Sequence, residues 1–322
     1  MQGSPRYRFL GLLAVALAIG AASAERAYVP NEGSGTLSVI DTATDRESAD
    51  SPLPRQGSLG EKLRGVALDR RGTTLFVVDA ARNLVLVVDP TNGAIKKTLP
   101  SIASAEGIEL APDGRTLAVC AELSNEAVFI DATALTERFR VKVQGSNPEH
   151  CVFSPDGRWL LTSNESSRNI DVIDVAAHKS VRLIKTDGAP RGMGFLPNGR
   201  AVYVANETAG TVDVVATDSW QVTKSIPIGE RPAGIIVRRD GARVYATSGG
   251  SGTVSVIDPK TDAVLARIVV GQRPWNMALT GDGKKLYVAN GRSNTVSVID
   301  TTTNVVVHTI ASGARPWGVV IR

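Results

Sequence analysis

Seven positions about 42 residues apart carry side chains of differing chemistry. The first four are charged, and the last three are an alanine and two tryptophans. In chain order they are Arg64, Glu106, Glu149, Arg191, Ala233, Trp275 and Trp317. Two residues before the last three lie Arg231, Arg273 and Arg315. Arginine and tryptophan can clamp a planar anion while carboxylates accept hydrogen bonds, so we predict a mixed pocket for a ligand or partner. The alternative is that the charges pair with one another and the tryptophans seal a channel.

His150 follows Glu149 directly and replaces the glycine of its repeat. A histidine beside a glutamate can carry acid–base chemistry, although one histidine at such a place is also compatible with a structural role. The sequence contains no Gly-x-Ser-x-Gly, Cys-x-x-Cys-His, zinc-type spacing or phosphate loop. We therefore predict no metal, no cofactor held by the chain itself and no complete catalytic set, with His150 and Glu149 as subordinate catalytic candidates.

The elements that position these residues follow from an internal repeat. A strand-like phrase that usually ends in Asp recurs seven times at a period near 42, with its last residue at Asp41, Asp89, Asp131, Asp174, Ala216, Asp258 and Asp300. Each unit holds four short runs rich in β-branched residues, and no helical period is present. Such repeats predict an all-β fold, a seven-bladed β-propeller of four-stranded antiparallel blades. A solenoid is the competing architecture, but it needs polar end caps that are absent here.

The chain ends predict how the ring closes. The sequence after residue 25 begins with the second run of a repeat, at 27–29, and ends with a first run, at 316–321. Pairing the two fragments completes one blade and covers two strand edges. We therefore expect 316–321 to be the innermost strand of a blade whose other strands come from 27–55, within a single domain spanning 25–322.

Residues 1–24 have the pattern of a signal peptide, with Arg6 and Arg8 before a short apolar run and a small-residue site at 22–24. The expected location is the periplasm or the outside of the cell, with no membrane span after cleavage. Without the two arginines the net charge falls from +4 to +2, which makes nucleic acid an unexpected partner. We expect a monomer. Cys120 and Cys151 fall in neighbouring repeats, and either a disulfide or two free thiols fits their spacing.

The phrases at 286–290 (LYVAN) and 315–318 (RPWG) resemble the YVTN family of β-propeller repeats over nearly all of 26–322. Within that family, the words at 105–107, 148–149, 163–165 and 271–275 are most similar to exported propellers associated with PQQ-dependent alcohol catabolism. The resemblance implies a non-catalytic binding or scaffold protein, with a periplasmic quinoprotein dehydrogenase or cytochrome c as partner and PQQ present only through that partner. Two alternatives stay open: a lyase or lactonase that uses His150 and a channel glutamate, and an exported nucleic-acid-binding propeller.

Overall fold

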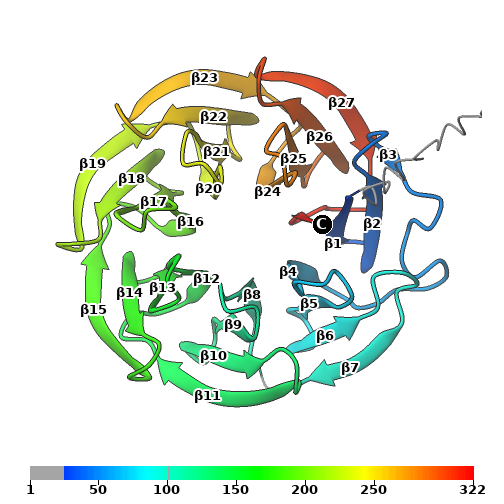
Figure 1. Ribbon diagram of the computed structural model, residues 1–322, viewed down its shortest axis with the longest axis horizontal. Helices are drawn as coiled ribbons and strands as arrows, with labels where there is room; N and C mark the ends of the chain where they lie inside the picture. Colours follow the sequence, from blue (N-terminus) through cyan, green and yellow to red (C-terminus); the bar gives the residue numbers. More distant parts are fainter. Residues whose placement is uncertain (1–24, 101) are drawn as a thin grey trace, which may run out of the picture.

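The computed structural model describes residues 25–100 and 102–322, and every helix or strand assigned in these ranges is a β-strand. The signal peptide predicted at 1–24 lies outside the described residues. The strands form seven four-stranded antiparallel sheets arranged in a ring (Figure 1). The all-β, seven-bladed propeller is confirmed. Within the described ranges no helix exists that could cross a membrane.

Six blades use four consecutive strands, ordered from the innermost to the outermost. Blades 2 to 4 contain β4 (Leu63–Leu68), β5 (Leu75–Asp79), β6 (Leu84–Val88) and β7 (Ile95–Leu99); β8 (Ala105–Leu110), β9 (Thr116–Ala121), β10 (Glu126–Asp131) and β11 (Thr136–Lys142); and β12 (Pro148–Phe153), β13 (Trp159–Asn164), β14 (Asn169–Asp174) and β15 (Lys179–Lys185). Blades 5 to 7 contain β16 (Pro190–Phe195), β17 (Ala201–Asn206), β18 (Thr211–Ala216) and β19 (Gln221–Pro227); β20 (Pro232–Val237), β21 (Val244–Ser248), β22 (Thr253–Asp258) and β23 (Ala263–Val269); and β24 (Pro274–Leu279), β25 (Lys285–Asn290), β26 (Thr295–Asp300) and β27 (Val305–Ala311).

Blade 1 joins the two ends of the described chain and closes the ring. Its order is β28 (Val320–Ile321), β1 (Arg26–Asn31), β2 (Thr36–Asp41) and β3 (Arg46–Glu47). The expected closure by a C-terminal innermost strand is confirmed, but regular pairing is shorter than 316–321. Only Val320 and Ile321 pair with β1 as a strand, and Pro316 makes an isolated bridge to Asn31. Proline has no N–H to donate, which limits ladder pairing at that end.

The core lies between the blades because the middle strands are covered on both faces. In β17 and β18 nearly every residue is buried, whereas the outermost strand β19 is mostly exposed. Aromatic rings on the second strands fill the space between blades, as the repeat predicts. They are Tyr28, Phe76, Tyr203, Tyr245 and Tyr287, all at most 5 % exposed. This stacking fixes the innermost strands side by side, and those strands carry the ring of reactive positions.

Candidate functional site

Close contact between innermost strands depends on glycine. The position after each reactive ring residue is glycine in five blades, namely Gly65, Gly107, Gly192, Gly234 and Gly318. A Cβ atom added at Gly107 would lie 2.7 Å from the Cα of His150, and one at Gly234 would lie 2.9 Å from Oδ1 of Asn276. The missing side chains thus leave room for His150 and Asn276, the two exceptions to the pattern. Both line a cavity of about 260 Å³ on the ring axis, the channel cavity.

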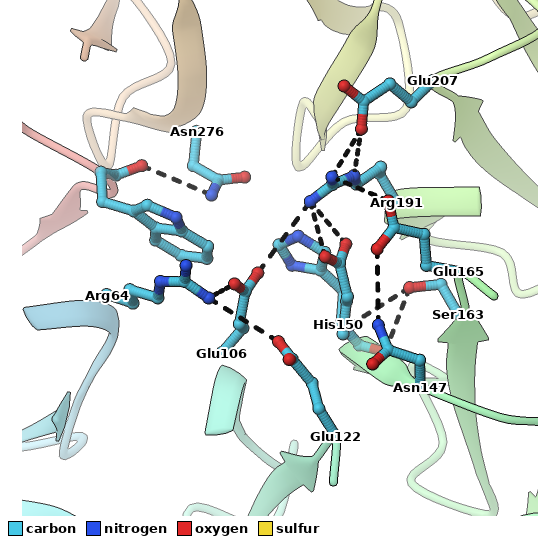
Figure 2. A network of polar contacts seen from close by, with 12 residues as sticks. Arg64, Glu106, Glu122, Asn147, His150, Ser163, Glu165, Arg191, Glu207 and Asn276 are labelled. Carbon is cyan, nitrogen blue, oxygen red and sulfur yellow. Dashed lines mark hydrogen bonds and ion pairs between the residues drawn. The ribbon is translucent and has the colours of Figure 1, made fainter. Parts of the chain in front are cut away.

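Above this cavity, arginines and glutamates from all seven blades form one salt-bridge network, which we call the mouth network; Figure 2 shows the part around Arg64 and Arg191. Its members are Glu32, Arg64, Glu106, Glu122, Glu149, Glu165, Arg191, Glu207, Arg231 and Arg273. The ring residues lie on the innermost strands or just before them, and the other carboxylates lie in loops between second and third strands. Four arginines therefore meet six carboxylates within the network. The alternative interpretation of the sequence, in which these charges pair between blades, matches this geometry.

Arg191 and Glu207 form the centre of the network. Arg191 contacts Glu149 (2.6 Å), Glu207 (2.6 Å) and Glu165 (3.0 Å). Glu207 also accepts from Arg231 (2.6 Å) and Arg273 (3.0 Å). Burial alone would raise the pKa of Glu207, but the surrounding arginines outweigh it and lower the pKa to about 2. Glu207 is therefore a permanent anion that holds three cations in place.

Arg64 organises the opposite side of the mouth. Its guanidinium contacts Glu106, donates to Glu32 (3.1 Å) and lies 3.7 Å from Glu122. Burial raises the pKa of Glu122 although Arg64 opposes the shift. Glu106 is buried and also lies 4.0 Å from Arg191. The two halves of the mouth network therefore meet at Glu106.

His150 lies at the boundary between the mouth network and the channel cavity. Its ring stacks on Trp317 with centroids 5.6 Å apart, and its backbone N–H donates to Ser163 Oγ (3.2 Å). Burial and the charges of Arg191 and Arg64 lower the pKa of His150 to about 3. The imidazole is therefore neutral at physiological pH, with an unprotonated ring nitrogen, and it is a weaker base than an ordinary histidine.

Glu149 precedes His150 in the sequence and forms an acid–base pair with it, in which the Glu149 carboxyl keeps its proton at neutral pH. Burial is the largest influence and raises the pKa of Glu149 to about 9; Arg191 opposes this shift, while the negative charge of Glu165 reinforces it. A protonated Glu149 can still accept the hydrogen bond from Arg191 through one oxygen, and it can donate its proton to a reacting group. A neutral base and a protonated acid in one site are what acid–base catalysis requires.

The same residues were tested as a metal site. Ligand atoms of Glu106, Glu149 and His150 lie within 4.8 Å of one another. Both carboxylates, however, already contact arginines, Glu106 through Arg64 and Glu149 through Arg191. Two cations at the group oppose the binding of a third, so the donor set does not fit a metal ion.

Two aromatic rings and a second cavity complete the site. Trp275 and Trp317 stack with centroids 6.5 Å apart, and Arg273 lies 4.1 Å from the centroid of the Trp275 ring. A larger pocket of about 840 Å³ lies beside the network, lined by Glu165, Arg191, Glu207, Thr208, Glu230, Arg231 and Ser251, among others. The larger pocket does not include His150, so we place the chemistry in the smaller channel cavity. Arg191 lines the larger pocket and also contacts Glu149, the neighbour of His150.

Nine residues were predicted to bind a ligand or partner, and eight of them meet at the mouth. Arg64, Glu106, Glu149, Arg191, Arg231 and Arg273 belong to the network, and Trp275 and Trp317 cover it. Arg315 is not brought into the network; its side chain is exposed and its backbone N–H donates to Asn294 (2.9 Å).

Glu207, Glu165 and Glu122 were expected in loops at the same mouth but were not among the nine predicted site residues, and Asn276 was missed altogether. The sequence did contain a signal for Asn276: like His150, it replaces the glycine that follows the ring residue in the other five blades. The three glutamates directly follow second strands. The repeat predicts the loops at these positions, but it does not predict which arginines the glutamates contact.

A family model described as "Lactonase, 7-bladed beta-propeller" matches residues 87–185 and 175–310, together more than half of the chain. No curated protein matches the sequence significantly.

Solved structures share the fold at low sequence identity. Hydrazine synthase of Kuenenia stuttgartiensis is 21 % identical with a TM-score of 0.72, over 80 % of this chain and 88 % of that one. A protein of unknown function from Desulfotomaculum acetoxidans DSM 771 is 17 % identical with a TM-score of 0.78, over 92 % and 98 %. A protein provisionally named a 6-phosphogluconolactonase, from Bacteroides uniformis ATCC 8492, is 20 % identical with a TM-score of 0.76, over 92 % and 99 %. At these identities the similarity establishes the fold alone.

The family match corrects the functional prediction. A non-catalytic binding or scaffold protein of PQQ-dependent alcohol oxidation was expected, and that expectation is wrong, because the matching family is one of lactonases. The expectation depended on short Arg-Pro-Trp and Glu-Gly motifs, which recur because they are parts of the propeller repeat. It also depended on the absence of a familiar catalytic motif, whereas the acid–base pair here consists of the adjacent residues Glu149 and His150, whose protonation states depend on burial and on arginines from other blades. The alternative of a lactonase-type enzyme fits better.

Proposed function

We propose that this chain, which belongs to the seven-bladed β-propeller lactonase family, hydrolyses a small lactone at the inner end of its channel mouth. The family match over more than half of the chain is the observation that carries the proposal. His150, which is neutral, and Glu149, which is protonated, supply the base and the acid for the proposed hydrolysis.

His150 is the general base of the proposed reaction. Its neutral imidazole takes a proton from water as the water oxygen attacks the lactone carbonyl. The carbonyl oxygen becomes an oxyanion, which the positive charge of Arg191 stabilises in a largely buried site. The imidazolium that forms is stabilised by Glu106, whose carboxylate is part of the same group.

Glu149 is the general acid. As the ring C–O bond breaks, its carboxyl donates a proton to the leaving alkoxide, which yields the hydroxyl of a hydroxy acid. The proton held by His150 then passes to the Glu149 carboxylate, which restores both groups, and the product carboxylic acid releases its own proton to solvent. Each group thus ends the cycle in its starting protonation state.

The size of the channel cavity limits the substrate. A volume of about 260 Å³ is below the ~300–1,000 Å³ of common drug-sized pockets. Trp317 and Asn276 line the cavity, so one flat ring with polar substituents suits it. Arg231, whose side chain is 52 % exposed, borders the larger pocket and can attract a negatively charged substituent.

The proposal is tested by assaying the purified protein against a panel of lactones. The panel contains five- and six-membered rings, sugar lactones with and without a 6-phosphate, and acyclic esters of similar size. We expect hydrolysis of at least one small lactone, seen as acid release in a pH-stat, above the rate without protein. Lack of turnover on all lactones, with binding of none, would reject the proposal.

The pH dependence of the reaction follows from the two pKa values. His150 is neutral above its pKa of about 3 and Glu149 is protonated below its pKa of about 9. We therefore expect kcat/KM to be flat between about pH 5 and 8 and to fall as the pH rises through 9, where the acid is lost. Substitution Glu149→Gln should lower the plateau and remove the alkaline fall. The profile is measured by initial rates corrected for spontaneous lactone hydrolysis, and an alkaline fall that persists in Glu149→Gln would assign it to another group.

From the predicted signal peptide we propose that this activity lies outside the cytoplasm. Under this proposal the substrate is a lactone available in the periplasm or the surrounding medium. Fractionation of cells that express the full-length chain tests the location, and recovery of uncleaved protein in the cytoplasm would contradict it.

A further inference from the structure

We infer that Cys120 and Cys151 form a dithiol between blades 3 and 4 that a small hydroperoxide oxidises to a disulfide. Both residues are free cysteines in the structure. The inference concerns a modification of the fold and holds whether or not the chain is a lactonase.

Strand alternation places the two thiols on facing surfaces. Cys120 and Ala118 lie two residues apart on β9 and therefore point to the same side of the sheet. Their partners on β10 are Ala127 and Phe129. Ala118, Ala127 and Phe129 belong to the apolar cluster against which Cys151 of blade 4 packs.

Contacts between the blades bring the thiols together. Cys151 Sγ lies 3.7 Å from the carbonyl oxygen of Ala118. The strand β12 that carries Cys151 approaches blade 3 closely, since a Cβ at Gly107 would lie only 3.1 Å from the Cys151 nitrogen. Burial is the main reason why the pKa of the Cys120 thiol is raised, and Cys151 raises it further, as expected of a second thiol close by. The two sulfurs therefore face each other across one blade interface.

The two cysteines differ in how accessible they are from the channel cavity, and this difference determines which one is oxidised first. Cys151 is half-buried and lines the channel cavity, whereas Cys120 is fully buried. A hydroperoxide is small enough for a cavity of about 260 Å³. Cys151 therefore reacts first, and Cys120 acts as the resolving thiol.

The chemistry is balanced in two steps. The Cys151 thiolate attacks one oxygen of hydrogen peroxide, forming the sulfenic acid and releasing hydroxide, which takes up the thiol proton to give water. Cys120 then attacks the Cys151 sulfur, so that the S–S bond forms and the sulfenic oxygen leaves as water with the Cys120 proton. Two thiols and one peroxide thus give one disulfide and two waters. Burial raises the pKa of the Cys120 thiol, which makes the second step the slower one.

The experiment treats the purified protein with hydrogen peroxide and measures intact mass and non-reduced peptide maps. We expect loss of two hydrogens, a peptide linking Cys120 to Cys151, and a rise in Tm of roughly 5 °C that a thiol reductant reverses, because the bond constrains the unfolded chain. Protein that already contains the link when purified gives the same evidence.

Two single variants separate this inference from independent oxidation of the two thiols. In Cys120→Ala, Cys151 should gain oxygen and be trapped by dimedone, since it has lost its resolving partner. In Cys151→Ala, Cys120 should stay reduced because no part of it is exposed. Wild-type protein that forms no cross-link under peroxide, or a Cys120 that is oxidised in Cys151→Ala, would overturn the inference. Neither readout depends on lactone hydrolysis.

Discussion

Replacing His150 by glutamine is expected to lower kcat/KM for lactone hydrolysis by about 10²- to 10⁴-fold, the usual contribution of a positioned general base. Glutamine keeps a polar side chain of similar length but has no basic nitrogen. The loss should fall on kcat with little change in KM, because His150 gains its proton only in the transition state. Rates are measured on the best lactone of the panel, with Tm as a check on folding.

His308→Ala is the matched control for His150→Gln. His308 lies on the outermost strand β27, with its side chain 54 % exposed, far around the blade from the channel. Its removal should leave kcat and KM unchanged. Equal losses in both variants would show that the effect is not specific to the site, and full activity in His150→Gln would remove His150 from the mechanism.

Replacing Arg191 by methionine is expected to reduce the free energy of unfolding by about 3–5 kcal/mol at neutral pH, the range found when one partner of a buried ion pair is removed. Methionine retains much of the aliphatic length but leaves Glu207 and Glu165 without one cation each. Glu207 keeps Arg231 and Arg273, so its pKa should rise without reaching its ordinary value. Urea unfolding followed by tryptophan fluorescence measures the loss.

The pH dependence of this variant provides a second readout. Lowering the pH protonates the carboxylates left without Arg191, so the stability difference from the wild type should shrink between about pH 7 and 4. Arg115→Met is the control, because the side chain of Arg115 is 69 % exposed in its contact with Asp131, and exposed pairs contribute about 0–1 kcal/mol. A deficit in Arg191→Met no larger than in Arg115→Met would show that the mouth network does not stabilise the ring.

Glu149 and His150 show how far the sequence could reach into the site. Repeat alignment placed both at the mouth, since each blade presents the same position to the same end of the ring. Alignment could not give their protonation states, which depend on burial and on Arg191, a residue from the next blade. Alignment also gave Glu207 the same status as the other acidic residues that follow second strands. In the structure, its contacts with three arginines make it the centre of the network.

The sequence by itself determined the seven blades and the closure of the ring, because both are written in short-range patterns: strand runs, turns and a period near 42 repeated along the chain. Only the tertiary structure decided which charges pair, which cavity holds His150 and that Cys120 faces Cys151. These features depend on side chains from different blades, tens of residues apart, meeting within a few ångströms. Local patterns specify each blade, whereas the chemistry depends on distances and burial that exist only when the blades are packed together.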